Sequence, residues 1–284
     1  MLNIMQAACA PPSLAVQMSR TGLAYRFEER VGSTKPPIVM LHGLASSMEL
    51  EDQLAFPDWK PLARKHSLLR FDCRGHGQSR QEVDGDKYTW SVLGHDICQL
   101  AKELNLEEVT LAGSSMGAAA SLYAALLANS YGLKIKALIL MLPPTYGETR
   151  KTQAHLYRKY QRIIKTQGTA ALIQLWRRSA PTPFFAREFP EAREINFAFF
   201  AKQDAESMAA AFLGAADSDF PEATFLQQLK MPTLILSRSD DPAHPIESAH
   251  HLKEAITGSH HQHASNASEI RNWSEDISSF LANC

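Results

Sequence analysis

Short runs that are apolar at every position alternate along the chain with segments whose apolar residues recur at helical spacing. The runs lie within residues 36–43, 66–73, 107–113, 135–144 and 231–237, and each is followed by glycine, proline or a polar turn. Residues 89–106, 246–256 and 269–281 carry the helical pattern. Strands that are apolar on both faces and alternate with helices are typical of a parallel sheet covered on both sides. We therefore expect an α/β fold with a mostly parallel central sheet.

Two regions depart from this alternation. Residues 13–19 and 23–31 meet at Thr21-Gly22 and predict an antiparallel hairpin that opens the chain. Residues 146–225 carry helical patterns with no intervening strand, which predicts a helical cap, or lid, inserted after the sixth strand. The expected organisation is a core of residues 1–145 and 226–284 with a cap of residues 146–225. We interpret the aromatic residues of the cap as the packing surface between its helices. Its basic run at 158–165 is interpreted as a solvated helix face.

Composition narrows the classes of partner. The chain has 284 residues, a hydrophobic fraction of 45%, and 29 basic against 30 acidic side chains. A net charge of −1 offers no field that would attract nucleic acid or an anionic membrane, so neither is expected as a partner. No apolar stretch approaches the length of a membrane span. Four cysteines without paired spacing, at positions 9, 73, 98 and 284, are read as reduced thiols in a cytoplasmic protein, and a signal peptide or lipid-modified Cys9 is not expected.

The segment "GSSMG", Gly113 to Gly117, carries the strongest chemical signal. It places Ser115 on a sharp turn between an apolar strand and a helix, the context in which a G-x-S-x-G serine is a nucleophile. The backbone N–H of Met116, at the start of that helix, and the N–H of Leu44, in "LHGLASS", are the expected oxyanion donors. His42 is interpreted as a structural residue whose hydrogen bonds support the turn in "LHGLASS".

Four segments in order, "LHGLASS", "FDCRGHGQS", "LAGSSMGAAASLYAA" and "PTLILSRSDDPAHP", resemble the α/β-hydrolase superfamily. The likeness spans about residues 20–284 and is greatest to the capped esterase and 3-oxoadipate enol-lactonase-like group. Ser115 in place of an aspartate argues against a haloalkane dehalogenase. The resemblance implies an acid in the loop after the strand "TLILS". Asp241 has the expected spacing to Pro245, and its neighbour Asp240 is expected to point elsewhere.

The resemblance also implies a histidine base in the loop after the final strand. Counting back from the last helix selects His263, although the interval from Asp241 is short and "SHHQHA" could itself be the final strand. If "SHHQHA" is the final strand, the position at which the family usually carries its base falls in "SNASE", which contains no histidine. His244 is therefore kept as the alternative base, while His260 and His261 are read as exposed or half-buried strand residues. A metal site at this histidine cluster is not favoured, because no carboxylate or cysteine completes a known ligand spacing.

The sequence thus predicts a cofactor-independent serine hydrolase that cleaves a small carboxylic ester or lactone through an acyl-enzyme. Its predicted site residues are Ser115, Asp241 and His263, or His244 as base, with Leu44 and Met116 at the oxyanion and with no metal. Two alternatives stay open: a C–C bond hydrolase or lyase that uses the same serine, and a non-catalytic ligand-binding protein with an incomplete triad. A homodimer is left open as the assembly.

Overall fold

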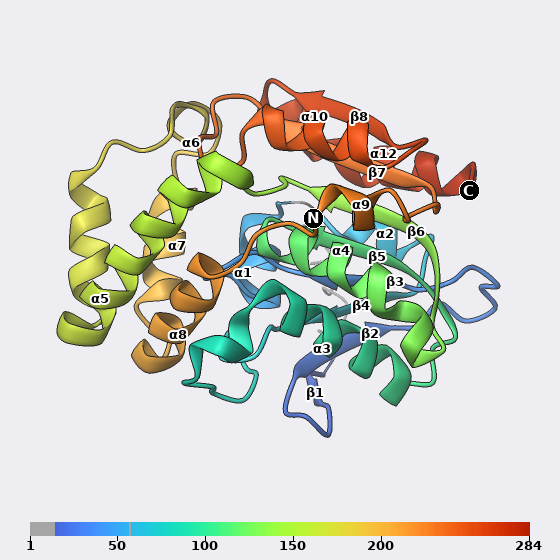
Figure 1. Cartoon of the computed structure of the whole chain (residues 1–284), viewed down its shortest axis with the longest axis horizontal. Helices are drawn as coiled ribbons and strands as arrows, with labels where there is room; N and C mark the ends of the chain where they lie inside the picture. Colours follow the sequence, from blue (N-terminus) through green and yellow to red (C-terminus); the bar gives the residue numbers. More distant parts are fainter. Residues whose placement is uncertain (1–14, 57) are drawn as a thin grey trace, which may run out of the picture.

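The computed structural model describes residues 15–56 and 58–284, and its centre is one sheet of eight strands in the order β1-β2-β4-β3-β5-β6-β7-β8 (Figure 1). The strands β3 to β8 run parallel to one another, β2 pairs antiparallel with β4, and β1 pairs antiparallel with β2. The mostly parallel sheet predicted from the apolar runs is confirmed. The strands are β1 (Gln17–Met18), β2 (Ala24–Glu28), β3 (Ile38–Leu41), β4 (Leu68–Phe71), β5 (Glu108–Ser114), β6 (Lys134–Met141), β7 (Thr233–Arg238) and β8 (His260–Ala264).

Successive side chains of the central strands point to opposite faces of the sheet, so the apolar runs fill two separate cores. In β3, Val39 and Leu41 belong to one core, whereas Ile38 and Met40 belong to the other. Helices α3, α4 and α10 cover the first core, and α2, α11 and α12 cover the second. Burial on both faces explains why these strands have no polar positions in alternation.

The helices of the two covering layers are α1 (Met48–Leu54), α2 (Lys60–Ala63), α3 (Trp90–Glu103), α4 (Met116–Leu127), α10 (Ile246–Ala255), α11 (Ala267–Arg271) and α12 (Trp273–Ala282), with short 3₁₀ helices at Gly85–Tyr88 and Ala128–Tyr131. The last predicted helix is therefore two helices that meet at Asn272. The opening hairpin is present between β1 and β2. The N-terminal segment with Cys9, and the first residues of the predicted hairpin, lie outside the described residues.

Between β6 and β7 the chain forms helices without a strand, namely α5 (Gly147–Arg178), α6 (Pro183–Glu188), α7 (Ala192–Phe200), α8 (Ala205–Ala216) and α9 (Ala223–Leu226). Helices α5, α7 and α8 gather at one end of the molecule, at the left in Figure 1. They enclose a third apolar cluster that includes Ile164, Leu172, Phe197 and Phe212, with Trp176 packed against it. The aromatic residues of this region therefore do pack among themselves.

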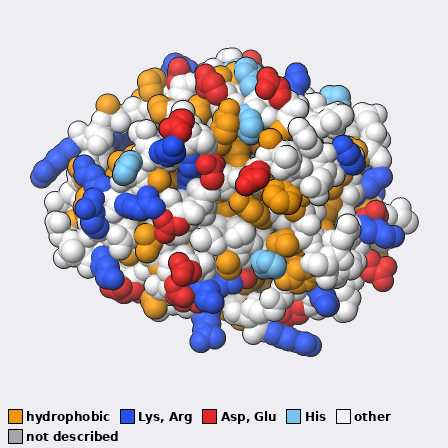
Figure 2. Space-filling view, in the orientation of Figure 1, with side chains coloured by type: hydrophobic (Ala, Val, Ile, Leu, Met, Phe, Trp, Pro, Cys, Tyr) orange, Lys and Arg blue, Asp and Glu red, His pale blue; other side chains and the backbone are white. Residues whose placement is uncertain are grey.

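The exposed side of α5 carries the basic run at 158–165. Arg158, Lys159, Arg162 and Lys165 are exposed, and Figure 2 shows Lys and Arg side chains gathered over the end of the molecule where α5 lies. This run is a solvated helix face, as its composition predicts. Within residues 15–56 and 58–284, no helix combines the length and apolar character needed to cross a bilayer.

Candidate active site

Ser115 lies at the turn where β5 ends and α4 begins, in a backbone conformation that few non-glycine residues adopt. Its φ is 53° and its ψ is −112°, so the residue is strained at positive φ. A hydrogen bond of 2.9 Å from the Ser115 N–H to the carbonyl of Met141 holds the turn against β6. The turn exposes the hydroxyl above the sheet, at the carboxyl ends of the parallel strands.

The glycines on both sides of Ser115 are required by close backbone contacts. A Cβ on Gly113 would lie 2.1 Å from the carbonyl oxygen of Gly117, and a Cβ on Gly117 would lie 2.0 Å from that of Leu41. Both distances are far below a van der Waals contact. The glycines thus allow α4 to start directly against β3 and β5, which is the physical basis of the G-x-S-x-G pattern.

The imidazole of His244 contacts the Ser115 hydroxyl. His244 Nε2 lies 2.8 Å from Ser115 Oγ, and His244 Nδ1 lies 2.8 Å from Asp241 Oδ2. Since an ionised carboxylate only accepts hydrogen bonds, Nδ1 carries the proton and Nε2 is free to accept from the serine. The structure therefore brings together a hydroxyl, an imidazole and a carboxylate in the order that nucleophilic catalysis requires.

Strand order explains how His244 reaches the serine. The loop after β7 starts two strands away from β5, a separation of about 10 Å at the usual strand spacing. A tight turn in which the His244 N–H donates to the Asp241 carbonyl at 3.0 Å directs both side chains of this loop to the same side. The imidazole then spans the gap between the acid and the serine.

Asp241 is buried and fully engaged. Its Oδ1 accepts the N–H of Ala243 at 3.2 Å, while Arg238 Nε and Nη2 both donate to Oδ2, the former at 2.7 Å. Burial alone would raise the pKa of this carboxyl, yet the charges and hydrogen bonds of His244 and Arg238 outweigh burial. The pKa of Asp241 therefore lies well below its ordinary value, and the group is ionised at neutral pH.

His263, the base selected by counting from the last helix, is not brought to Ser115. It lies within β8, paired in register with Ser237, and its ring nitrogens contact Ser237 Oγ at 2.9 Å and Ser239 Oγ at 3.0 Å. Because β8 lies three strands from β5, about 14 Å away, a side chain within that strand cannot reach the serine. The expected placement is corrected: the segment "SHHQHA" is the final strand, and the alternative, His244, makes the contact.

The neighbouring candidates lie where the sequence predicts. His260 is exposed and His261 half-buried on β8, with His261 Nε2 2.7 Å from Ser237 Oγ. Asp240 points away from Asp241 and lies 3.6 Å from Nη1 of Arg187 on α6. Within the described part of the chain, no group of three or more His, Cys, Asp or Glu side chains is arranged to hold a metal ion.

Two buried histidines support the turn that follows β3. His42 accepts the N–H of Cys73 at 3.0 Å through Nε2, and its Nδ1–H donates to the Gly43 carbonyl at 2.7 Å. His76 accepts the N–H of Ala45 at 3.2 Å and donates to the Arg74 carbonyl at 2.9 Å. Burial lowers the pKa of His42 to about 4 and that of His76 to about 3, so both rings are neutral.

This turn carries Leu44, whose N–H was predicted as an oxyanion donor, and it lies beside Ser115. A Cβ on Gly43 would be 3.4 Å from the Cβ of Ser115. Met116, the other predicted donor, is the first residue of α4. His76 was not among the residues predicted from the sequence, although its place in "RGHG", two residues after Arg74, was a visible signal.

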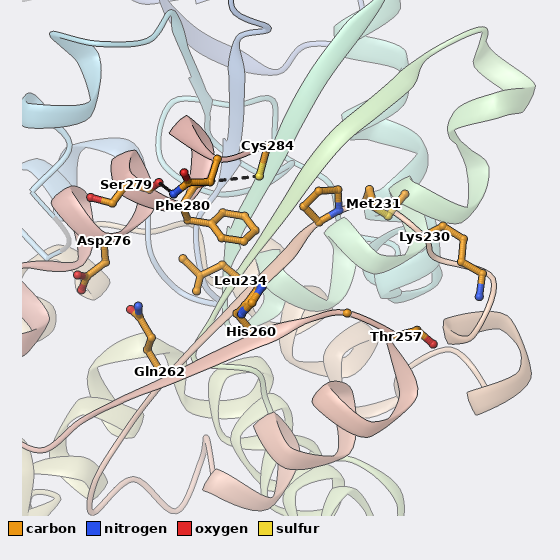
Figure 3. A pocket seen from close by; sticks show the side chains of 13 residues that line it. Lys230, Met231, Leu234, Thr257, His260, Gln262, Asp276, Ser279, Phe280 and Cys284 are labelled. Atoms are coloured by element: carbon orange, nitrogen blue, oxygen red, sulfur yellow. Dashed lines mark hydrogen bonds between the residues drawn. The ribbon is translucent and has the colours of Figure 1, made fainter.

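A cavity of the described chain lies away from these residues. It measures about 600 Å³ and is lined by residues from the start of β7, from β8 and from α12, including Leu234, His260 and Phe280 (Figure 3). Leu234 is near the amino end of β7, whereas Asp241 and His244 follow its carboxyl end. The cavity therefore opens at the opposite end of the strand from Ser115 and does not belong to this site.

The chain was compared with known proteins. A family model described as alpha/beta hydrolase fold matches residues 36–275. The 3-oxoadipate enol-lactonase 2 of Acinetobacter baylyi is 24% identical over 227 residues, 79% of each chain. A putative 2-succinyl-6-hydroxy-2,4-cyclohexadiene-1-carboxylate synthase of Bacillus subtilis is 26% identical over 184 residues, 62% of this chain and 61% of that protein. The solved enol-lactonase of Burkholderia xenovorans superimposes with a TM-score of 0.70 at 23% identity, over 92% of this chain and 96% of that one.

The family model covers most of the chain, including β3, the Ser115 turn and the loop with Asp241 and His244. The sheet order and the position of the inserted helices agree with the resemblance stated from the sequence. The chain belongs to the α/β-hydrolase fold family and is an enzyme of the hydrolase type.

Proposed function

We propose that this enzyme is a serine hydrolase that cleaves a small carboxylic ester or lactone through an acyl-enzyme, with Ser115 as nucleophile, His244 as base and Asp241 as acid. The single observation that carries the proposal is the 2.8 Å contact between His244 Nε2 and Ser115 Oγ. The relatives named enol-lactonases support the substrate class.

The contacts support a sequence of proton transfers. His244 Nε2 takes the proton of the Ser115 hydroxyl as Oγ attacks the carbonyl carbon, and the Asp241 carboxylate stabilises the imidazolium. The N–H groups of Leu44 and Met116 stabilise the oxyanion. His244 then gives its proton to the leaving oxygen as the C–O bond breaks. Water attacks the acyl-enzyme, His244 takes the water proton, and this proton returns to Oγ as the acid is released.

We further propose that residues 146–225 form a cap over this site, on a core of residues 1–145 and 226–284. Two observations support the division. The helices α5, α7 and α8 share an apolar cluster, and Leu44 and Ala45 of the oxyanion turn pack against that cluster. A cap seated on this turn limits the room above Ser115, which is consistent with a small substrate.

Labelling with a fluorophosphonate probe tests the proposal without knowledge of the substrate. We expect stoichiometric labelling of the native protein at neutral pH and none of Ser115→Ala, because only an activated hydroxyl attacks phosphorus. Ser114→Ala, which changes the adjacent serine, is the matched control and should still be labelled. An unlabelled native protein, or equal labelling of Ser115→Ala, would contradict the proposal.

A second candidate, a lyase or C–C bond hydrolase that uses the same serine, is favoured by the similarity to the protein named a synthase. Probe labelling does not separate the two classes, since both need a reactive Ser115. A panel of p-nitrophenyl esters set against a vinylogous diketone does. Turnover of the esters with none of the diketone supports the ester hydrolase, and the reverse result supports the second candidate.

A further inference from the structure

Arg238 is a buried cation directly beside the proposed acid. It is the last residue of β7 and only 4% exposed, and two of its nitrogens donate to Asp241 Oδ2, the same oxygen that accepts from His244. Its third nitrogen, Nη1, is buried without a hydrogen-bond partner among the described residues. A cation in such a place needs a compensating environment, because burial of charge is costly.

Aromatic rings supply that environment. The guanidinium carbon of Arg238 lies 4.3 Å from the ring centre of Phe185, 5.0 Å from that of Phe184 and 5.7 Å from that of Phe56. The negative faces of such rings attract a cation, most strongly where water is excluded. Phe184 and Phe185 belong to α6, one of the helices inserted after β6. The inserted helices therefore contact the acid of the proposed triad through Arg238.

Resting on the proposed function, we infer that Arg238 is a positioning residue for the acid–base pair: it holds the Asp241 carboxylate in the orientation in which Oδ2 contacts His244 Nδ1. The loop orients the carboxylate through the hydrogen bond from the Ala243 N–H to Oδ1. Oδ2, the oxygen that contacts His244, is held by two nitrogens of the Arg238 guanidinium fork. The aromatic residues of α6 hold the fork.

The charge of Arg238 also acts on the Asp241 carboxyl. Together with His244 it holds the pKa of Asp241 well below its ordinary value, against the effect of burial. The other charged groups around this loop are Asp240, Arg187 and Glu188, which are paired with one another near the surface. Solvent screens them more than it screens Arg238.

The variants Arg238→Gln and Arg238→Lys separate the effect of the Arg238 charge from the effect of its hydrogen bonds. Glutamine can still donate to Asp241 but carries no charge, while lysine keeps the charge and loses the fork. The rate at which a fluorophosphonate labels Ser115 is measured at neutral pH over a range of probe concentrations, which separates the inactivation rate constant from probe binding. We expect Arg238→Gln to lower the inactivation rate constant about tenfold with probe binding unchanged, because the Asp241–His244 pair loses its fixed orientation while the space above Ser115 is untouched. Arg238→Lys, which keeps the charge, should recover part of this loss.

Two results would overturn the inference. One is an Arg238→Gln variant whose inactivation rate constant equals that of the native protein. The other is loss of the folded circular dichroism spectrum in both Arg238→Gln and Arg238→Met, which would make Arg238 a folding residue only. His244→Ala is measured in parallel. If it keeps the native labelling rate, the proposed triad fails; if it is inactive while Arg238→Gln keeps the native rate constant, only the role of Arg238 fails.

Discussion

At the scale of single residues, the proposed chemistry depends on which imidazole serves Ser115. The hydrogen bonds of His244 tie it to both Ser115 and Asp241, whereas those of His263 tie it to two serines at the end of β7. The two histidines are therefore a matched pair for substitution. His244 takes part in the proposed proton transfer. His263 lies in the same region of the sheet and takes no part in it.

We expect His244→Ala to lower kcat/KM for an activated ester on the order of 10³-fold or more, because the serine loses the imidazole that contacts its hydroxyl. His263→Ala should stay within about threefold of the native value, since the buried Ser237 hydroxyl keeps its contact with His261 Nε2 and the Ser239 hydroxyl can bond to water. Steady-state hydrolysis of p-nitrophenyl acetate by the two variants is the measurement. A larger loss of kcat/KM in His263→Ala than in His244→Ala would mean that the base is His263 of β8.

The residues of the site differ in how far the sequence determines them. Ser115 follows from a local pattern, because the strand, the two glycines and the helix around it leave one conformation. Asp241 follows from its spacing to Pro245. The base does not follow in the same way, because counting along the chain cannot tell whether "HHQH" is a strand or a loop. Arg238 carried no sequence signal for its burial, since the aromatic rings that surround it come from α6 and from Phe56.

At the scale of elements, close contacts between backbone atoms constrain the conformation of the turn between β5 and α4. We expect Gly117→Ala to destabilise the fold by about 3 kcal/mol or more, because its Cβ overlaps the carbonyl of Leu41 in β3 and backbone cannot move aside cheaply. Gly43→Ala is the control: its Cβ would meet Ser115 and Ser114 at 3.4 and 3.5 Å, which is ordinary contact.

Urea unfolding of the two glycine variants checks this expectation. The midpoint of Gly117→Ala should fall well below that of the native protein, while Gly43→Ala should stay within about 1 kcal/mol of it. Equal midpoints would mean that the elbow can relax, and that the G-x-S-x-G pattern is not required by packing in this chain.

The elements themselves were largely readable from the sequence. Apolar runs with both faces buried identify the parallel strands, since no other structure in a chain of this length buries them as well. Helix ends were less predictable: residues 269–281 continue one apolar face, yet the backbone breaks at Asn272, and α5 is interrupted at Gly168, where φ is 81°. Such breaks depend on how neighbouring elements pack, which periodicity does not contain.

At the scale of the whole molecule, one buried carboxyl, that of Glu51, makes the stability of the fold depend on pH. Glu51 of α1 is 6% exposed, and Trp59 Nε1 donates to its Oε2 at 3.2 Å. Burial raises the pKa of Glu51 to about 8 from an ordinary value of 4.5, although the charge of Arg70 opposes this rise. The folded protein therefore keeps a proton on Glu51 over a range in which the unfolded chain has lost it.

The sign of the effect follows from that difference. Between pH 4.5 and about 8 the folded state binds more protons than the unfolded state, so the contribution of Glu51 to stability falls as the pH rises and levels off above about 8. In Glu51→Gln the amide oxygen can still accept from Trp59, but it has no proton to lose. We expect the native protein to lose about 2 kcal/mol more than Glu51→Gln when the pH is raised from about 6 to about 8. Urea unfolding of both proteins at the two pH values measures this difference, and parallel losses would show that Glu51 is ionised in the folded state.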